Sequence, residues 1–370
     1  MNICIECKVL NHHHRSGVMT YTEGLVNGLY QNDRDNNYIL NYYSLRMKAS
    51  QMPGPAERNF EKIVLPVPDG NFPLRQELLD RFMLPAFFKK HKIRVFHRPD
   101  GYTMPSTKDV FKILTIHDLR SLTIGDTTYQ QNIEAYRKTL NAVDSCVVVS
   151  ECTKQDLLKH FKIDERKVKV VYLGADKRFQ QIDPAQVEAV KRKYAIHERF
   201  LLAMGYVQRK NLAAIITAFA QSRQKRDFIL ILTTHADIQK YEALADSLGI
   251  KDRILILDQL LDDEIVALYN GCHAFVFPSL YEGFGLPILE AMQCGAPVIT
   301  SNSSSCPEVA GDATILVDPK NTQEIADAIN EICENEGRRQ ELISRGFKRS
   351  QLFSWNNFAL KMKEIYDAAK

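Results

Sequence analysis

Two glutamates, Glu282 and Glu290, stand on either side of the run Gly283-Phe284-Gly285-Leu286-Pro287. The apolar run Ala274–Phe277 before them is typical of a buried strand, and Pro287 suits the first position of a helix. The glycine-rich turn should therefore bring backbone N–H groups to a helix N-terminus. Unpaired amides and the helix dipole favour a phosphate or diphosphate at such a place.

The two carboxylates should have different partners. A carboxylate directly beside a phosphate is repelled, so both side chains are expected to face hydroxyl groups. Glu282, just before the turn, could accept hydrogen bonds from hydroxyls near the anion, and Glu290, one turn into the helix, could reach a ribose diol. For an arbitrary pair of glutamates, solvated surface charge is the more common interpretation.

Arg209 and Lys210 support a ligand site. They follow the strand-like run Phe200–Met204 and Gly205, and a segment of helical pattern begins after Asn211. The planar fork of an arginine and the compact charge of a lysine can together neutralise a diphosphate. Both charges would lie at the carboxyl end of a strand, where parallel sheets bind ligands.

The first half of the chain holds two further candidates. His117 and Asp118 follow the strand-like run Lys112–Ile116, where the imidazole could hydrogen-bond a transferred group or its acceptor. The run His12-His13-His14-Arg15-Ser16-Gly17 connects the first strand to the first helix. Because neighbouring side chains diverge, a loop that faces the donor or the acceptor is favoured there over a metal site.

Thirteen short, mostly apolar runs alternate with amphipathic segments of helical length. Wholly apolar runs indicate parallel strands buried on both faces, and their alternation with helices indicates doubly wound sheets. We therefore predict an α/β protein with strands at Ile3–Glu6, Tyr38–Tyr43, Lys62–Val67, Arg94–His97, Lys112–Ile116, Cys146–Ser150, Val168–Leu173, Phe200–Met204, Phe228–Thr233, Arg253–Leu257, Ala274–Phe277, Pro297–Thr300 and Thr314–Val317.

The alternating pattern occurs twice, with a polar interval between. We predict an N-terminal Rossmann-like domain at residues 1–176, a linker at 177–198, a second Rossmann-like domain at 199–350 and a C-terminal helix at 351–370. Doubly wound sheets bind ligands at the carboxyl ends of their strands, so the two domains are expected to face a central ligand cleft.

Composition narrows the classes of function. The 370 residues are 45% hydrophobic and 25% charged, as in ordinary globular proteins, and the N-terminal stretch lacks the features of a signal peptide, which predicts a cytoplasmic protein. The net charge of +3 is too small for a dense nucleic-acid-binding face, so no nucleic acid partner is expected. Eight scattered cysteines do not indicate a disulfide framework.

The segment Leu78–Lys92 is apolar with a basic end and has two interpretations. It could be a core helix kinked at Pro85. It could instead be an interfacial helix on anionic lipid, which would attach the N-terminal domain to the cytoplasmic face of a membrane.

The sequence lacks several common catalytic and nucleotide-binding motifs and contains one run that only resembles a metal-binding motif. The chain has no P-loop, no G-x-G-x-x-G after the first strand and no G-x-S-x-G nucleophile elbow. Asp33 and Asp35 imitate a metal-binding D-x-D, but they follow a helix within a polar run and are interpreted as a turn.

Together these residues resemble the retaining glycosyltransferases of the GT-B fold, specifically glycosyltransferase family 4. The signature is the E-x7-E element from Glu282 to Glu290. It is supported by Arg209-Lys210-Asn211, Gly295-x-Pro297, His117-Asp118, Val149–Lys154, His97-Arg98-Pro99-Asp100 and the closing Phe353–Trp355 helix start.

The resemblance implies roles for the matching residues. In the second domain, Arg209 and Lys210 would bind the diphosphate of a nucleotide-sugar donor, and amides around Phe284, Gly285 and Leu286 would meet phosphate or sugar. Glu282 would contact the sugar and Glu290 the ribose. Further residues assigned by the resemblance are Gly17 and Gly283 on the donor side and His97, Asp100, His117 and Asp118 on the acceptor side. The catalytic residues that it implies are His117, Glu282, Arg209 and Lys210.

The resemblance further implies transfer of a hexose with retention and without a metal or other cofactor, because fixed positive groups stabilise the departing diphosphate. The final helix would cross back to the first domain. First-domain segments resemble mannosyltransferases, which favours GDP-mannose, then UDP-sugars, and a glycan or lipid-linked acceptor in surface-polysaccharide synthesis. A nucleotide-sugar-binding subunit without activity and a nucleotide-sugar epimerase of related fold stay open as alternatives.

Overall fold

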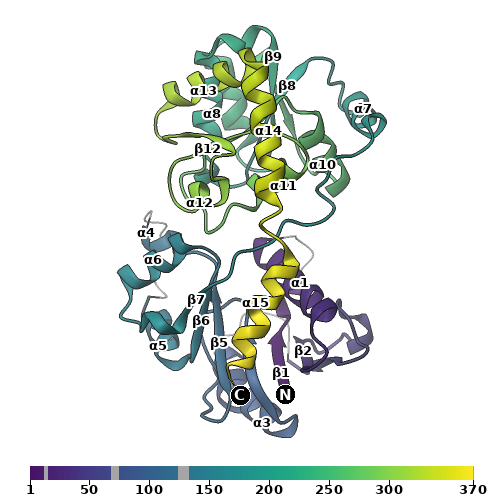
Figure 1. The fold of residues 1–370 in the computed structure, drawn as a ribbon, viewed down its shortest axis with the longest axis vertical. Coiled ribbons are helices and arrows are strands. Elements are labelled where there is room, and N and C mark those ends of the chain that lie inside the picture. The colour runs from purple at the N-terminus through teal and green to yellow at the C-terminus, as the bar shows by residue number, and fades with distance from the viewer. Residues whose placement is uncertain (12–15, 68–74, 124–132, 370) are drawn as a thin grey trace. The chain divides into compact units, whose positions relative to one another are not determined.

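The computed structural model describes residues 1–11, 16–67, 75–123 and 133–369, which form two compact units (Figure 1). The first unit comprises Met1–Gly174 and Ser354–Lys370, and the second comprises Ala175–Phe353. Each unit is built on one parallel sheet flanked by helices. The histidines of the run at positions 12–14 lie outside the described residues.

The sheet of the first unit has seven strands in the order β3-β2-β1-β4-β5-β6-β7, and all its pairs are parallel. Its strands are β1 (Asn2–Glu6), β2 (Asn37–Tyr43), β3 (Phe60–Leu65), β4 (Ile93–Arg98), β5 (Phe111–Ile116), β6 (Ser145–Val148) and β7 (Val168–Val170). Its helices are α1 (Gly17–Asn32), α2 (Arg75–Leu78), α3 (Leu84–Lys90), α4 (Arg120–Thr123), α5 (Ile133–Ala142), α6 (Glu151–His160) and α15 (Trp355–Asp367).

The sheet of the second unit has six strands in the order β10-β9-β8-β11-β12-β13, again all parallel. Its strands are β8 (Arg199–Met204), β9 (Phe228–Thr233), β10 (Ile254–Leu257), β11 (Ala274–Phe277), β12 (Val298–Ser301) and β13 (Thr314–Val317). Its helices are α7 (Pro184–Lys193), α8 (Leu212–Gln221), α9 (Ile238–Ser247), α10 (Asp262–Gly271), α11 (Leu286–Gln293), α12 (Cys306–Ala310), α13 (Thr322–Glu334) and α14 (Glu336–Ser350).

The structure confirms the predicted α/β class and all thirteen strands, whose ends shift by at most three residues. The central strands are buried on both faces: every residue of β9 and β11 is buried. This burial explains why these strands read as continuous apolar runs rather than as alternating ones. In both sheets the strand order reverses, between β1 and β4 and between β8 and β11, and such points are where doubly wound sheets bind ligands.

The interval 177–198 is not a bare linker. It contains α7, which packs against α10 inside the second unit. Gly271 of α10 permits this contact, because a Cβ atom there would lie 2.8 Å from Val187 Cγ1. The sequence pattern did not indicate α7 because this helix is polar and has no buried residue, so it lacks an apolar stripe.

The final helix packs on the first unit, as expected. α15 lies along α1, and the two glycines of α1 make room for it (Figure 1). A Cβ atom on Gly24 would lie 2.2 Å from the Trp355 ring, and one on Gly28 would lie 2.8 Å from the Trp355 carbonyl oxygen. Small residues at positions 24 and 28 are therefore required for this helix pair to form.

The segment Leu78–Lys92 is mainly a core element. It is divided among α2, a π-helical turn η3 (Leu79–Met83) and α3, and Leu79, Leu84, Phe87 and Phe88 are buried. Pro85 has no N–H to donate, which accounts for the irregular turn before it. Leu78 and Phe82 remain exposed, at 52% and 60%. Within the described residues, no helix is both long enough and apolar enough to span a bilayer.

Candidate functional site

Arg209 and Lys210 are positioned by the short connection between β8 and α8. The 3-10 turn η6 (Gln208–Lys210) ends at Asn211, which adopts a left-handed conformation with φ 64°. The Asn211 amide donates to the carbonyl groups of Pro278 and Pro319 at 3.0 and 2.7 Å. Asparagine tolerates the left-handed region, and its side chain ties this turn to the loops after β11 and β13.

Gly205 allows Lys210 to lie against the end of β8. A Cβ atom on Gly205 would stand 2.3 Å from Lys210 Cβ, far inside van der Waals contact. The Lys210 ammonium also lies 4.6 Å from the centroid of the Phe277 ring, within the range of a cation–π interaction. The lysine side chain is therefore fixed on both sides.

Glu282 joins both cations. Its carboxylate accepts from Lys210 Nζ at 2.7 Å, pairs with Arg209 Nη1 at 2.8 Å and accepts from Ser279 Oγ at 2.6 Å. The side chain is only 7% exposed. Burial raises the pKa of this carboxyl, but the charges of Lys210 and Arg209 outweigh that effect and hold the pKa at about 2. Glu282 is ionised, and the three side chains form one charged cluster.

Two adjacent strands bring this cluster together. β8 and β11 pair with each other at the point where the strand order of the second sheet reverses. Arg209 and Lys210 follow β8, and Glu282 follows β11, so the cluster lies at the carboxyl ends of both strands. This is the position at which the topology predicts a ligand.

Serines that sequence reasoning missed hold the loop from Pro278 to Gly285. The Glu282 N–H donates to Ser304 Oγ at 3.0 Å, and the Ser305 hydroxyl lies 2.9 and 2.8 Å from the carbonyl oxygens of Glu282 and Phe284. The polar run Asn302–Ser305 directly after β12 could have indicated these contacts. Because β12 pairs with β11, the loops that follow the two strands lie next to each other.

The start of α11 has the local structure of an anion site. Gly285 caps the helix with φ 109° and ψ 44°, a region that favours glycine. Pro287 occupies the second helical position rather than the first. The Phe284 side chain is 4% exposed and packs on Phe353, so it is the backbone at this position that can meet a ligand. Glu290 follows one turn later and accepts from the Tyr269 hydroxyl at 3.4 Å.

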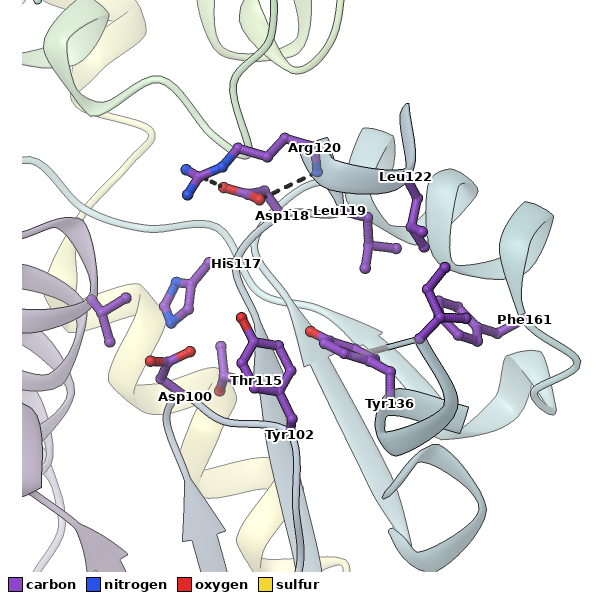
Figure 2. Close-up of a pocket in the computed structure, with 12 residues that line it drawn as sticks. Asp100, Tyr102, Thr115, His117, Asp118, Leu119, Arg120, Leu122, Tyr136 and Phe161 are labelled. Atoms are coloured by element: carbon purple, nitrogen blue, oxygen red, sulfur yellow. Dashed lines mark hydrogen bonds and ion pairs between the residues drawn. The ribbon is translucent and has the colours of Figure 1, made fainter. Parts of the chain in front are cut away.

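Three of the predicted acceptor-side residues share one pocket of the first unit. Asp100, His117 and Asp118 line it, and they follow the carboxyl ends of the paired strands β4 and β5 (Figure 2). His117 donates Nε2–H to the Pro99 carbonyl at 2.8 Å, so a neutral ring keeps Nδ1 as an acceptor. Asp118 pairs with Arg120 at 3.4 Å.

His97 lies beneath this pocket rather than in its wall. The side chain is fully buried, and its ring nitrogens lie 2.7 Å from the Tyr366 hydroxyl and 2.8 Å from Thr115 Oγ1. Burial lowers the pKa of His97 to about 3, so the ring is neutral. Its assignment to the acceptor side stays a prediction: His97 is not among the residues that line the pocket, but it lies within hydrogen-bond distance of Thr115, which is part of the lining.

Gly17, Asp33 and Asp35 belong to the ends of α1. Gly17 begins the helix, and a Cβ atom there would meet none of the described atoms within 4 Å, so no close approach is present. Asp33 is buried and accepts from the Tyr38 hydroxyl at 2.6 Å, while Asp35 pairs with Lys363 at 3.1 Å. Both aspartates fix the turn after α1, and Lys363 connects them to α15.

Two family models match the chain. The model described as Glycosyltransferase Family 4 matches residues 16–179, and the model described as Glycosyl transferases group 1 matches residues 187–349. Between them they cover most of both units.

Similar proteins include named enzymes of bacteria. The chain is 30% identical over 291 residues to the serotype-specific mannosyltransferase WbdA of Escherichia coli, covering 74% of this chain and 35% of that protein, so it spans about a third of WbdA. It is 27% identical over 288 residues to the O-antigen chain mannosyltransferase B of Escherichia coli, covering 75% of each. The structure of Anabaena HepE in complex with UDP and glucose has a TM-score of 0.77 at 17% identity and covers 100% of both chains, which shows a shared fold.

Proposed function

We propose, from the premise that this chain belongs to glycosyltransferase family 4 and has the GT-B fold, that it transfers a hexose from a nucleotide-diphosphate sugar to a glycan or lipid-linked acceptor. One observation carries the proposal. Arg209 and Lys210, which are partly buried, form a charged cluster with the buried Glu282 where the second sheet reverses its strand order, and the loop of Glu282 leads directly into α11. Cations beside a helix N-terminus suit a diphosphate.

In the proposed reaction, Arg209 and Lys210 stabilise the leaving group. Transfer breaks the bond between the sugar and the diphosphate, so negative charge grows on the departing oxygen. Arg209 and Lys210 would stabilise that charge, and Glu282 holds both cations in place before the donor arrives, which reduces the cost of reorganisation. A carboxylate has about four lone-pair positions, so Glu282 can still accept a sugar hydroxyl.

The donor and the stereochemistry follow from relatives and family. Both similar Escherichia coli proteins are named mannosyltransferases, which favours GDP-mannose, and the HepE complex with UDP and glucose makes UDP-sugars the next candidates. The name of the second relative supports a role in surface-polysaccharide synthesis. Retention of anomeric configuration is proposed from the family resemblance. Independence of metal is proposed because Arg209 and Lys210 can supply the positive charge that the diphosphate needs.

We also propose peripheral contact of the first unit with an anionic membrane. Leu78 and Phe82 expose apolar side chains, and Arg81, Lys89 and Lys90 on the same segment are basic. Exposed apolar groups beside cations are what an interfacial helix presents to anionic lipid.

Donor binding tests the proposed site. Melting temperatures are measured with GDP-mannose, UDP-glucose and ADP-glucose, because a ligand that binds only the folded state raises the transition. GDP-mannose is expected to give the largest rise, with and without EDTA. Lys210→Ala should lose the rise, and the matched control Lys240→Ala, on an exposed position of α9, should keep it. No rise with any of the three sugars contradicts the site, and a rise that requires Mn²⁺ contradicts metal independence.

A further inference from the structure

The pocket lined by Asp100, His117 and Asp118 is the size of one small ring. Its volume is about 140 Å³. In another protein, a cavity of about 150 Å³ takes one benzene molecule. A volume of this size suits a single six-membered ring better than a long lipid chain.

One part of the pocket is aromatic and apolar. The rings of Tyr102 and Tyr136 lie 5.2 Å apart, inclined at 57°, and Tyr136 stacks on Phe161 at 5.7 Å. Figure 2 shows these two tyrosines between the side of His117 and Asp100 and the side of Leu122 and Phe161. Rings packed against one another in this way present aromatic faces at a fixed angle, against which the C–H groups of a ligand can pack.

The opposite part is polar and rich in hydrogen-bond acceptors. The carboxylates of Asp100 and Asp118 are acceptors, so the ligand that suits them donates hydrogen bonds. Among the described residues that line the pocket, Arg120 is the only lysine or arginine, and it pairs with Asp118. An anionic ligand would meet two carboxylates and one committed guanidinium, which disfavours phosphate and sugar acids.

A pyranose ring has the combination that this pocket requires. It is one six-membered ring, its C–H face packs on aromatic surfaces, and its hydroxyls donate hydrogen bonds. We propose that this pocket binds a neutral pyranose, the terminal sugar of the acceptor, with Tyr102 and Tyr136 as its platform and Asp100 and Asp118 on its hydroxyls. The inference rests on the proposed transfer function and specifies its acceptor: the sugar is recognised in this pocket, and any lipid lies outside it.

Binding of one amphipathic probe tests this proposal. In saturation-transfer NMR with octyl α-D-mannopyranoside and the full chain, ring protons of the sugar should receive the strongest signal. Tyr136→Ala should abolish that signal, and the matched Tyr136→Phe, which keeps the ring, should retain it. Signals confined to the octyl chain, or ring signals unchanged in Tyr136→Ala, overturn the proposal. Circular dichroism of each variant shows whether it is folded, and Asp118→Asn provides a second variant that leaves the aromatic packing intact.

Transfer kinetics separate this inference from the proposed function. With a mannose-terminated oligosaccharide, Tyr136→Ala and Asp118→Asn are expected to raise the acceptor KM by about tenfold or more, the loss typical of a tightly packed or charge-assisted contact. The donor KM should stay unchanged. Equal effects on both KM values, or none, overturn the pocket assignment while transfer itself stands. Failure of the wild-type protein to transfer overturns the proposed function, and the NMR result then still decides whether the pocket binds a sugar.

Discussion

Lys210 can reach Glu282 only because residue 205 has no side chain. We predict that Gly205→Ala, whose new Cβ would lie 2.3 Å from Lys210 Cβ, displaces the lysine and lowers kcat. Loss of one group that stabilises a developing anion costs about 100-fold in rate. Steady-state kinetics of transfer measure the effect. Gly337→Ala, where the new Cβ would be in ordinary contact at 3.5 Å, is the matched control. Equal activity of the two variants would contradict the importance of the lysine position.

The ion cluster also makes stability depend on pH. Glu282 has its pKa lowered from 4.5 to about 2 in the folded state, so its contribution is complete above pH 4.5 and disappears as the pH falls towards 2. The shift corresponds to about 3 kcal/mol in the free energy of unfolding. Denaturant titrations at pH 6 and pH 3 should show Glu282→Gln less stable than wild type at pH 6, with the difference smaller at pH 3. A difference of the same size at both pH values contradicts the lowered pKa.

Sequence reasoning found the residues of this cluster but not their contacts. Arg209, Lys210 and Glu282 could be predicted as neighbours because each follows an apolar strand. Their direct pairing depends on the left-handed Asn211 and on the serines after β12, which fix the two loops. Loop conformations of this kind leave no periodic pattern in a sequence. The burial of His97 could not be predicted for a similar reason, since the partner of its Nδ1, Tyr366, lies 269 positions away.

At the scale of elements, the contact between α1 and α15 should be sensitive to mutation, because it leaves no room for a side chain at Gly24 or Gly28. We predict that Gly24→Val strongly destabilises the first unit, because even a Cβ atom at position 24 would lie 2.2 Å from the Trp355 ring. Overpacking of this kind costs about 1–3 kcal/mol. Thermal unfolding measures it, with Gly17→Ala as the control in the same helix. A melting temperature that is equal in Gly24→Val and wild type would contradict the observed helix contact.

The segment from α2 to α3 allows a test of membrane contact. Phe82→Asp removes an exposed apolar ring and adds a negative charge, so it should reduce cosedimentation with vesicles of anionic phospholipid. Leu352→Asp, a change at an equally exposed leucine of the second unit, should bind like wild type. Wild-type protein that stays in the supernatant with anionic vesicles would contradict the proposed contact.

Strands and helices could be predicted from the sequence where their side chains are buried. The central strands stand out because burial on both faces requires continuous apolar residues. α7 was missed because it has no buried side chain, and the division of Leu78–Lys92 into three helical pieces could not be anticipated, since Pro85 alone suggests a kink but not a π-helical turn.

For the whole molecule, the two-fold repetition of strands and helices predicted two sheets, and both units have the strand order of a doubly wound fold. The boundary moved to Ala175 because α7 packs on α10 and so belongs to the second unit. The closing helix returns to the first unit, as the family resemblance implied. Nothing in the composition of α15 itself identifies α1 as its partner, since that pairing depends on the glycines of α1.

Transfer of mannose tests the central claim most directly. Purified protein is incubated with GDP-mannose and a mannose-terminated oligosaccharide, and the product is analysed by mass spectrometry and by NMR of its new anomeric centre. We predict a product heavier by one hexose and joined by an α-linkage, as in the donor, with Lys210→Ala inactive and Lys240→Ala active. A β-linked product would contradict retention. Full activity of Lys210→Ala, or no transfer from GDP-mannose or any UDP-sugar, would contradict the proposed site and function.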